Sequence, residues 1–137
     1  MRELMKTNVY DVGETVLIVG SCLPQMEPEG FARLCEGADS VFELCLEQTH
    51  VNMAITKISA MLYTGKIKTL IFATVDRSPH CVQMHYIQNE LRRMMDLSKV
   101  RIENYVVEKG KLTRLSPELI YLSKYLGELS RKMGEKE

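Results

Sequence analysis

The sequence predicts a single α/β domain built on a mostly parallel β-sheet. Two observations carry this prediction. Residues 14–20 and 69–75 are short apolar runs rich in β-branched side chains, which is typical of strands buried on both faces. Segments with helical spacing of apolar residues alternate with these strands along the chain. No repeat or linker interrupts the pattern, so we expect residues 1–137 to form one domain around one core.

The first half of the chain reads as strand, helix, strand, helix. A buried strand over residues 14–20 ends at a glycine, and a short helix is expected over residues 28–36. Residues 40–45 form the second expected strand, with Glu43 inside it indicating the edge of the sheet. Thr49 is the expected cap of a long helix that ends at Gly65.

The second half repeats the alternation and ends in a hairpin. After the strand at residues 69–75, Ser78 and the proline that follows it are expected to begin the third helix. Residues 100–107 and 111–115 flank a turn at residues 108–110, which predicts a fourth strand with an antiparallel return. A last helix is expected over residues 117–133, with a leucine stripe that covers the sheet or forms a dimer; we expect the former.

Right-handed crossovers between these elements give a three-layer α/β sandwich with helices on both faces of the sheet. The two most apolar strands belong at the centre, so the expected strand order is 2-1-3-4, with the C-terminal hairpin strand beyond it. This is a flavodoxin-like or Rossmann-like arrangement.

Charge and hydropathy narrow the class of protein. Lys and Arg together number 18, as do Asp and Glu, so the chain lacks the basic character of nucleic-acid-binding proteins. The longest uncharged apolar stretch, residues 15–23, is too short to cross a bilayer, and residues 1–8 lack the apolar segment of a secretory signal. We therefore expect a cytoplasmic protein with neither nucleic acid nor membrane as partner and with cysteines present as free thiols.

Three of the four cysteines follow strands. Cys22 follows the first strand, Cys45 ends the second, and Cys81 lies just after the third. Loops that follow parallel strands emerge at one edge of the sheet, where ligands bind, so we expect these three thiols to lie close together. Each has the alternative of being a small buried hydrophobe, and Cys45 also that of pointing into the sheet face. We expect Cys35, within the first helix beside apolar residues, to serve packing alone.

All three histidines fall in the first turns of helices at the same edge. They are His50, His80 and His85, and His85 shares a helix face with Cys81. The N-terminus of that helix is expected to favour the Cys81 thiolate. Cys22, Cys45 and Cys81 with His85 as the leading nitrogen ligand would suit zinc or an iron–sulfur cluster. Three thiolates do not complete a cluster, so His50, His80 or His85, a cysteine of a partner protein or an exogenous ligand would supply the remaining position. The alternatives are a metal-free redox pair of cysteines, solvent exposure of His50 and His80, and a plain hydrogen bond from His85 to Asp76 or to a loop carbonyl.

The layout resembles one known family. Cys22, Cys45, and Ser78-Pro79-His80-Cys81 followed by His85-Tyr86 are similar to the iron–sulfur delta subunit family of methyl-viologen-reducing hydrogenases. That family has further cysteines near the first strand and at the end of the third, where this chain has Thr74 and Val75. The resemblance implies a cluster on the cysteines at the strand ends. It also implies electron transfer to a protein partner within a larger redox complex.

Two other classes of function are open. Unpaired N–H groups at helix starts, with Arg77, Ser78 and Thr49, would hold a small anion or nucleotide without a metal, although no pyrophosphate-binding motif occurs. The second class is a protein-interaction module or a homo-oligomer that has no catalytic or redox activity. No catalytic residue is assigned from the sequence. The leading hypothesis is a small redox or metal-binding domain that uses the thiols at the edge of the sheet.

Overall fold

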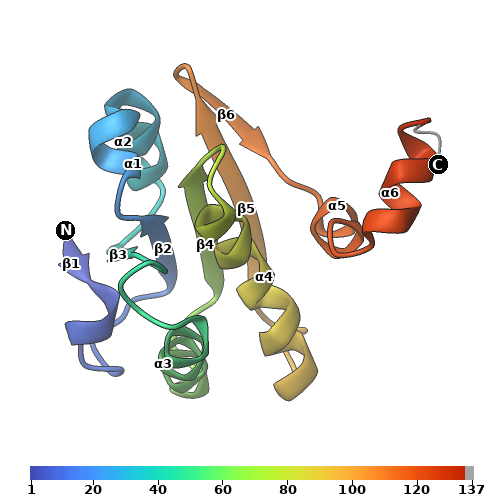
Figure 1. Cartoon of the computed structure of the whole chain (residues 1–137). Coiled ribbons are helices and arrows are strands. Elements are labelled where there is room, and N and C mark those ends of the chain that lie inside the picture. Colours follow the sequence, from blue (N-terminus) through green and yellow to red (C-terminus); the bar gives the residue numbers. More distant parts are fainter. Residues whose placement is uncertain (135–137) are drawn as a thin grey trace.

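The computed structural model describes residues 1–134, which contain a six-stranded sheet in the order β1-β3-β2-β4-β5-β6 (Figure 1). Strands β1 to β5 run parallel, and β6 runs antiparallel to β5. The strands are β1 (Arg2–Glu3), β2 (Thr15–Gly20), β3 (Ser40–Leu44), β4 (Thr69–Val75), β5 (Arg101–Glu108) and β6 (Lys111–Arg114). The helices are a 3-10 turn (Leu4–Lys6), α1 (Leu23–Met26), α2 (Pro28–Glu36), α3 (Val51–Tyr63), α4 (Pro79–Met94), α5 (Pro117–Leu122) and α6 (Leu126–Lys132).

The expected strand order 2-1-3-4 is found in the structure. The second, first, third and fourth expected strands are β3, β2, β4 and β5, and they are neighbours in this order. The expectation that the strand with Glu43 forms the edge is wrong. Strand β1 pairs outside it, with Glu3 opposite Glu43. Two charged, exposed residues carry no strand pattern, which is why the sequence does not reveal β1.

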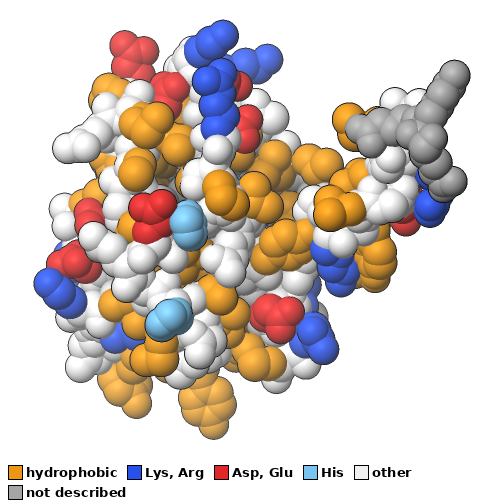
Figure 2. Space-filling view, viewed as in Figure 1, with side chains coloured by type: hydrophobic (Ala, Val, Ile, Leu, Met, Phe, Trp, Pro, Cys, Tyr) orange, Lys and Arg blue, Asp and Glu red, His pale blue; other side chains and the backbone are white. Residues whose placement is uncertain are grey.

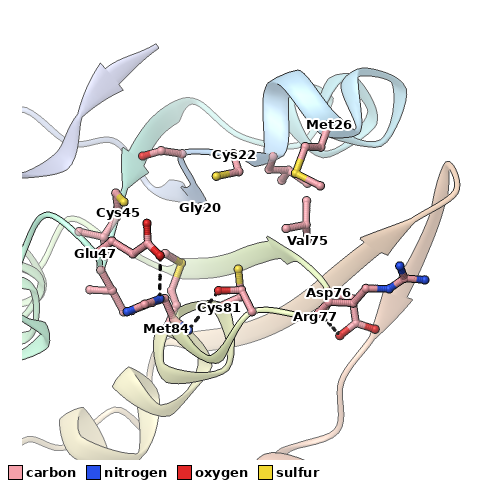
Figure 3. A pocket seen from close by; sticks show the side chains of 16 residues that line it. Gly20, Cys22, Met26, Cys45, Glu47, Val75, Asp76, Arg77, Cys81 and Met84 are labelled. Carbon is pink, nitrogen blue, oxygen red and sulfur yellow. Dashed lines mark hydrogen bonds and ion pairs between the residues drawn. The ribbon is translucent and has the colours of Figure 1, made fainter.

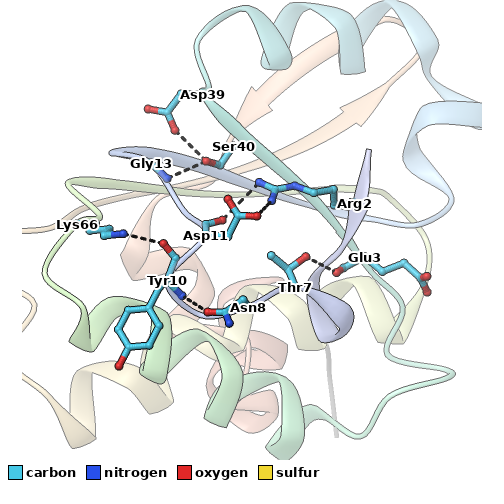
Figure 4. A network of polar contacts seen from close by, with 10 residues as sticks. All are labelled: Arg2, Glu3, Thr7, Asn8, Tyr10, Asp11, Gly13, Asp39, Ser40 and Lys66. Atoms are coloured by element: carbon cyan, nitrogen blue, oxygen red, sulfur yellow. Dashed lines mark hydrogen bonds and ion pairs between the residues drawn. The ribbon is translucent and has the colours of Figure 1, made fainter.

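Polar contacts hold this N-terminal segment against the sheet (Figure 4). Arg2 pairs with Asp11, and its guanidinium lies 4.8 Å from the centre of the Phe42 ring. Further along, the Gly13 N–H donates to the Ser40 hydroxyl at 2.9 Å, and Lys66 donates to the Tyr10 carbonyl at 2.7 Å. These last contacts lie at the amino edge of the sheet, opposite the loops that carry the cysteines.

Alternate residues of the central strands enter two separate cores. Val16 and Ile18 of β2 face α3 and α4, whereas Leu17 and Val19 face α1 and α2. All four side chains are at most 1% exposed. A strand buried on both faces needs apolar residues at every position, which explains the continuous apolar run in the sequence.

Hydrogen bonds and close packing connect helix α2 to the β5–β6 hairpin. The hairpin turn uses Lys109 and Gly110, both at positive φ (53° and 77°), the conformation of a two-residue turn that suits the strand twist. The Glu27 carboxylate accepts hydrogen bonds from both of their N–H groups, at 2.6 and 3.1 Å. Gly30 lets α2 approach β5, because a Cβ there would lie 2.4 Å from a methyl group of Val107.

The C-terminal region differs from expectation. The single helix expected over residues 117–133 is two short helices, α5 and α6. Helix α5 contacts α4 and buries Ile120, whereas α6 has no buried residue and stands away from the sheet (Figures 1 and 2). The Ser123 hydroxyl donates to the Ile120 carbonyl at 2.8 Å, a local bond that competes with continuation of the helix. Leu119 and Leu126 are exposed, so the expectation that the leucine stripe covers the sheet is wrong.

Two smaller expectations about helices also need correction. Helix α3 begins after His50 rather than Thr49, and neither side chain caps it. The short helix α1 precedes α2 as a separate turn. Among residues 1–134, no helix combines the length and apolar character that a membrane span requires.

Candidate functional site at the carboxyl edge of the sheet

The carboxyl ends of β2, β3 and β4 surround a pocket of about 300 Å³ (Figure 3). Cys22 lies two residues after β2, Cys45 directly after β3, and Cys81 in the first turn of α4, and all three line this pocket. We call it the thiol pocket. The expectation that these cysteines share one edge of the sheet is met, because three adjacent parallel strands deliver them to the same place.

The three thiols differ in exposure. Cys22 is exposed, whereas Cys45 and Cys81 are half-buried. In Figure 3 the Cys81 sulfur points toward the loop that carries Cys22. Cys45 faces the pocket rather than the interior of the sheet, and its carbonyl accepts the N–H groups of Gln48 and Thr49. Cys35 packs against the apolar core on the α2 face, as expected.

The pKa of the Cys81 thiol departs from the expected direction. Burial raises this pKa above 9.0, and the nearby charges of Cys22 and Asp76 raise it further. Hydrogen bonds with the side chains of Ser78 and Thr74 lower this pKa and are outweighed. The prediction that the start of a helix favours a Cys81 thiolate is therefore wrong, because loss of hydration exceeds the effect of the helix dipole.

The three histidines lie in different places in the structure. His80 lines the thiol pocket and lies 3.3 Å from the Glu47 carboxylate. His50 is exposed at the start of α3 and is not among the described residues that line the pocket. His85 is 4% exposed and belongs to a second pocket on the other side of α4.

Both ring nitrogens of His85 are engaged. The Thr74 hydroxyl lies 2.9 Å from Nε2, and the Asn104 carbonyl oxygen lies 2.8 Å from Nδ1. The Asn104 amide in turn donates to Gln88 at 2.7 Å. These four side chains form a buried chain of hydrogen bonds that links β4, α4 and β5. His85 thus offers no free nitrogen to a metal, and the partners it has are Thr74 and Asn104 rather than Asp76.

The residues of the anion-binding alternative do not converge. Arg77 is exposed and pairs with Glu108 at 3.2 Å. The Ser78 hydroxyl accepts the His80 N–H, and the Ser78 carbonyl accepts the next two N–H groups of α4. Because Pro79 has no N–H, the first turn of α4 keeps no backbone donor for an anion. Thr49 belongs to the turn after β3 and is not among the described lining residues.

Comparison with known proteins agrees with this architecture. A family model described as a Rossmann-like domain matches residues 12–136. The chain belongs to the Rossmann-like domain family. No curated protein and no solved structure matches the sequence. The match includes strands β2 to β6 and the helices on both faces of the sheet. The finer resemblance to hydrogenase delta subunits stays a prediction.

The Rossmann-like domain carries its cysteines where this fold binds ligands, but not in metal-binding geometry. Among residues 1–134, no three His, Cys, Asp or Glu side chains lie close enough together to hold one metal ion. The expectation of zinc or an iron–sulfur cluster stays a prediction, and it requires movement of the side chains or a further ligand.

Sequence reasoning missed two groups of site residues. Met26 and Met84, which no sequence motif marks as site residues, add two thioethers to the thiol pocket. Thr74 and Asn104 complete the buried chain around His85. A polar residue inside an apolar strand is the signal that would have found them, because a buried polar side chain requires a partner.

Proposed function

We propose that this Rossmann-like domain is a small thiol-based redox protein that works at the thiol pocket. The observation that carries the proposal is that Cys22, Cys45 and Cys81, delivered by three adjacent strand ends, line one pocket. Cys35, the remaining cysteine, packs against the core instead. Placement of three thiols at the ligand-binding edge of the fold supports a shared chemical role over separate packing roles.

We assign different roles to two of the thiols that line the pocket. Cys22 is exposed and is the group that a disulfide substrate reaches first. Cys81 is half-buried, and burial raises its pKa, so it is a poor attacking thiol toward molecules in solution. It sits beside Cys22 closely enough for their charges to interact, which suits it to the second, intramolecular step.

The reaction balances as a two-electron exchange. The Cys22 thiolate attacks one sulfur of a disulfide and releases the first thiol of the substrate. The Cys81 thiolate then attacks the Cys22 sulfur and releases the second thiol. The products are a Cys22–Cys81 disulfide and two thiols, which take up the two protons that the cysteines lose. An external dithiol reductant restores the starting state.

Peptide mapping tests this proposal. The reduced protein is treated with bis(2-hydroxyethyl) disulfide, the remaining thiols are alkylated, and the tryptic peptides are analysed by mass spectrometry. Cys22 lies in the tryptic peptide of residues 7–33 and Cys81 in that of residues 78–92, so a link between them is a distinct mass. We expect this linked pair to be the main product.

Matched variants define the outcome. Cys22→Ser removes the link, and Cys35→Ser leaves its yield unchanged because that thiol packs away from the pocket. Equal modification of all four cysteines without any linked peptide would contradict the proposal. The peptide of residues 34–57 contains both Cys35 and Cys45. A dominant link between it and the peptide of residues 7–33 that persists in Cys35→Ser would transfer the role of Cys81 to Cys45.

A metal-bound form of the same pocket is the second candidate, and the donor atoms favour it. Cys22, Cys45 and Cys81 with the thioethers of Met26 and Met84 place five sulfur-bearing side chains around one space, as soft metals prefer. Zinc or an iron–sulfur cluster would need the thiols to draw together, with His80 or a partner protein completing the ligands. The protein partner itself stays a prediction.

Anaerobic purification tests the metal-bound form. Metal and acid-labile sulfide are measured on the wild-type protein, on Cys45→Ser and on Cys35→Ser, together with the absorption spectrum. Stoichiometric metal that Cys45→Ser loses and Cys35→Ser keeps would support this form. A colourless, metal-free wild-type protein would leave the disulfide-forming pair as the function of the pocket.

A further inference from the structure

The walls of the thiol pocket combine an apolar lining with two carboxylates. The apolar part consists of aliphatic and thioether side chains, namely Leu23, Met26, Leu44, Leu46, Val75 and Met84. Glu47, in the loop after β3, and Asp76, directly after β4, also line the pocket. Figure 3 shows these two residues on opposite sides of Cys81. A disulfide that enters the pocket therefore meets negative charge on both sides of the Cys81 sulfur.

Neither carboxylate is paired with a lysine or arginine side chain among residues 1–134. Glu47 has the imidazole of His80 as its partner, with Nδ1 3.3 Å from a carboxylate oxygen. A histidine, unlike lysine or arginine, carries no permanent positive charge. Asp76 accepts the backbone N–H of Arg77 at 3.1 Å, which leaves its negative charge without a counter-ion.

Arg77 is the one lysine or arginine among the described residues that line the thiol pocket, and its charge is directed elsewhere. Its guanidinium pairs with Glu108 at 3.2 Å, and Glu108 is not among the described lining residues. In Figure 3 the Arg77 side chain extends away from Cys22 and Cys81. The first turn of α4 also keeps no free N–H, so an anionic group finds no donor there.

The charge of Asp76 acts at the position of the reacting sulfurs. It is one of the causes that raise the pKa of the Cys81 thiol, so its field disfavours negative charge at that sulfur. The same field attracts an ammonium group that a substrate brings beside Cys81 and repels a carboxylate. Because Glu47 and Asp76 are exposed, the effect of each is modest and salt reduces it.

We propose that the thiol pocket selects its disulfide substrates by charge and prefers short apolar disulfides that carry a cationic group. Neutral disulfides rank second and anionic disulfides last. The inference rests on the proposed thiol–disulfide exchange and names its substrate class. The apolar chain of the substrate contacts the aliphatic and thioether lining, and its cationic group lies near Glu47 or Asp76. These two carboxylates are the residues that determine the specificity.

Three disulfides of similar size test the proposal: cystamine is cationic, bis(2-hydroxyethyl) disulfide is neutral and dithiodiglycolate is anionic. Each reacts with the reduced full-length protein at low salt. Alkylation and peptide mapping give the rate at which Cys22, in the peptide of residues 7–33, loses its free thiol. Each rate is divided by that of the same disulfide with mercaptoethanol, which removes differences in intrinsic reactivity. We expect the normalised rate of cystamine to exceed that of dithiodiglycolate by about tenfold.

Removing either carboxylate is expected to weaken this preference. Glu47→Gln and Asp76→Asn keep the shape of exposed side chains, so both variants are expected to fold. Each is expected to lower the ratio of the cystamine rate to the dithiodiglycolate rate by about two- to fivefold. Glu90→Gln is the matched control, because it removes the same charge from an exposed position of α4 that does not line the pocket. Added salt is expected to lower the ratio in the wild-type protein.

The linked peptide separates failure of this inference from failure of the proposed function. Equal normalised rates, a faster anionic probe, or a preference that survives replacement of both carboxylates would overturn the charge selection while the Cys22–Cys81 link still forms. An effect of Glu90→Gln as large as that of Asp76→Asn would overturn it as well. A wild-type protein that forms no such link with any of the three disulfides would overturn the proposed function and this inference together.

Discussion

His85 and its hydrogen-bond partners are the most unusual residues of the interior. Thr74, His85, Gln88 and Asn104 are each at most 4% exposed, and every one of them has a partner within the chain. Burying such groups costs free energy that their hydrogen bonds largely offset. The network is thus sensitive to the protonation of its one titratable member.

Stability is expected to fall as the pH drops below about 6.5. The pKa of His85 is lowered from 6.5 in the folded state, mainly by burial, so the unfolded chain binds the proton more readily. The loss of stability that protonation of His85 causes is absent at higher pH. Below about pH 6.5 the free energy of unfolding falls by at most about 1.4 kcal/mol for each pH unit. Urea unfolding of the wild-type protein at pH 7.5, 6.5 and 5.5 measures it.

Other groups titrate over the same range, so the comparison is made with His85→Gln. We expect the free energy of unfolding of this variant to depend less steeply on pH than that of the wild-type protein. Identical slopes for the two proteins would show that the folded state does not disfavour a charged His85.

At the level of elements, α2 is positioned by its close approach to β5. Gly30 lies where the helix crosses the strand, and Glu27 holds the hairpin turn at the N-terminal end of the same helix. The contact matters for function because α1 and α2 follow the loop that carries Cys22 into the thiol pocket.

Gly30→Ala is expected to lower the free energy of unfolding by about 1–3 kcal/mol. The added Cβ would lie 2.4 Å from the Val107 methyl carbon, so helix and strand must separate. Gly37→Ala is the matched control, since the nearest atom to its Cβ is 4.0 Å away. Chemical denaturation measures both, and an equal effect of the two substitutions would refute the packing argument. Adding Val107→Ala to Gly30→Ala is expected to recover part of the loss.

For the whole molecule, the two helices of the C-terminal arm contribute unequally. Helix α5 buries Ile120 against the body of the domain, whereas none of the residues of α6 is buried. A chain that ends at Lys124 loses little buried apolar surface, so it is expected to keep its free energy of unfolding within about 1 kcal/mol of the full chain. A chain that ends at Arg114 is expected to lose about 2 kcal/mol or more through the burial of Ile120 and its neighbours.

Urea unfolding of both shortened proteins beside the full chain tests this division. A large loss of stability in the chain that ends at Lys124 would show that α6 packs on the domain. An unchanged stability in the chain that ends at Arg114 would show that the burial of Ile120 by α5 does not stabilise the domain.

The sequence by itself determined the architecture and the shared position of three cysteines. Strands buried on both faces need uninterrupted apolar residues, so residues 14–20 and 69–75 identify the centre of the sheet, and parallel strands send Cys22, Cys45 and Cys81 to one edge. These inferences depend only on local pattern and on rules of chain connection.

Tertiary structure alone decided the properties that depend on neighbours distant in sequence. Burial reversed the expected ionisation of Cys81, and partners on β4 and β5 turned His85 away from the cysteines. Strand β1 forms because β3 offers it an edge, and the expected last helix is divided into α5 and α6, which leaves Leu119 and Leu126 of its leucine stripe exposed. Hydration and hydrogen-bond partners are set by the assembled fold, so no pattern along the chain specifies them.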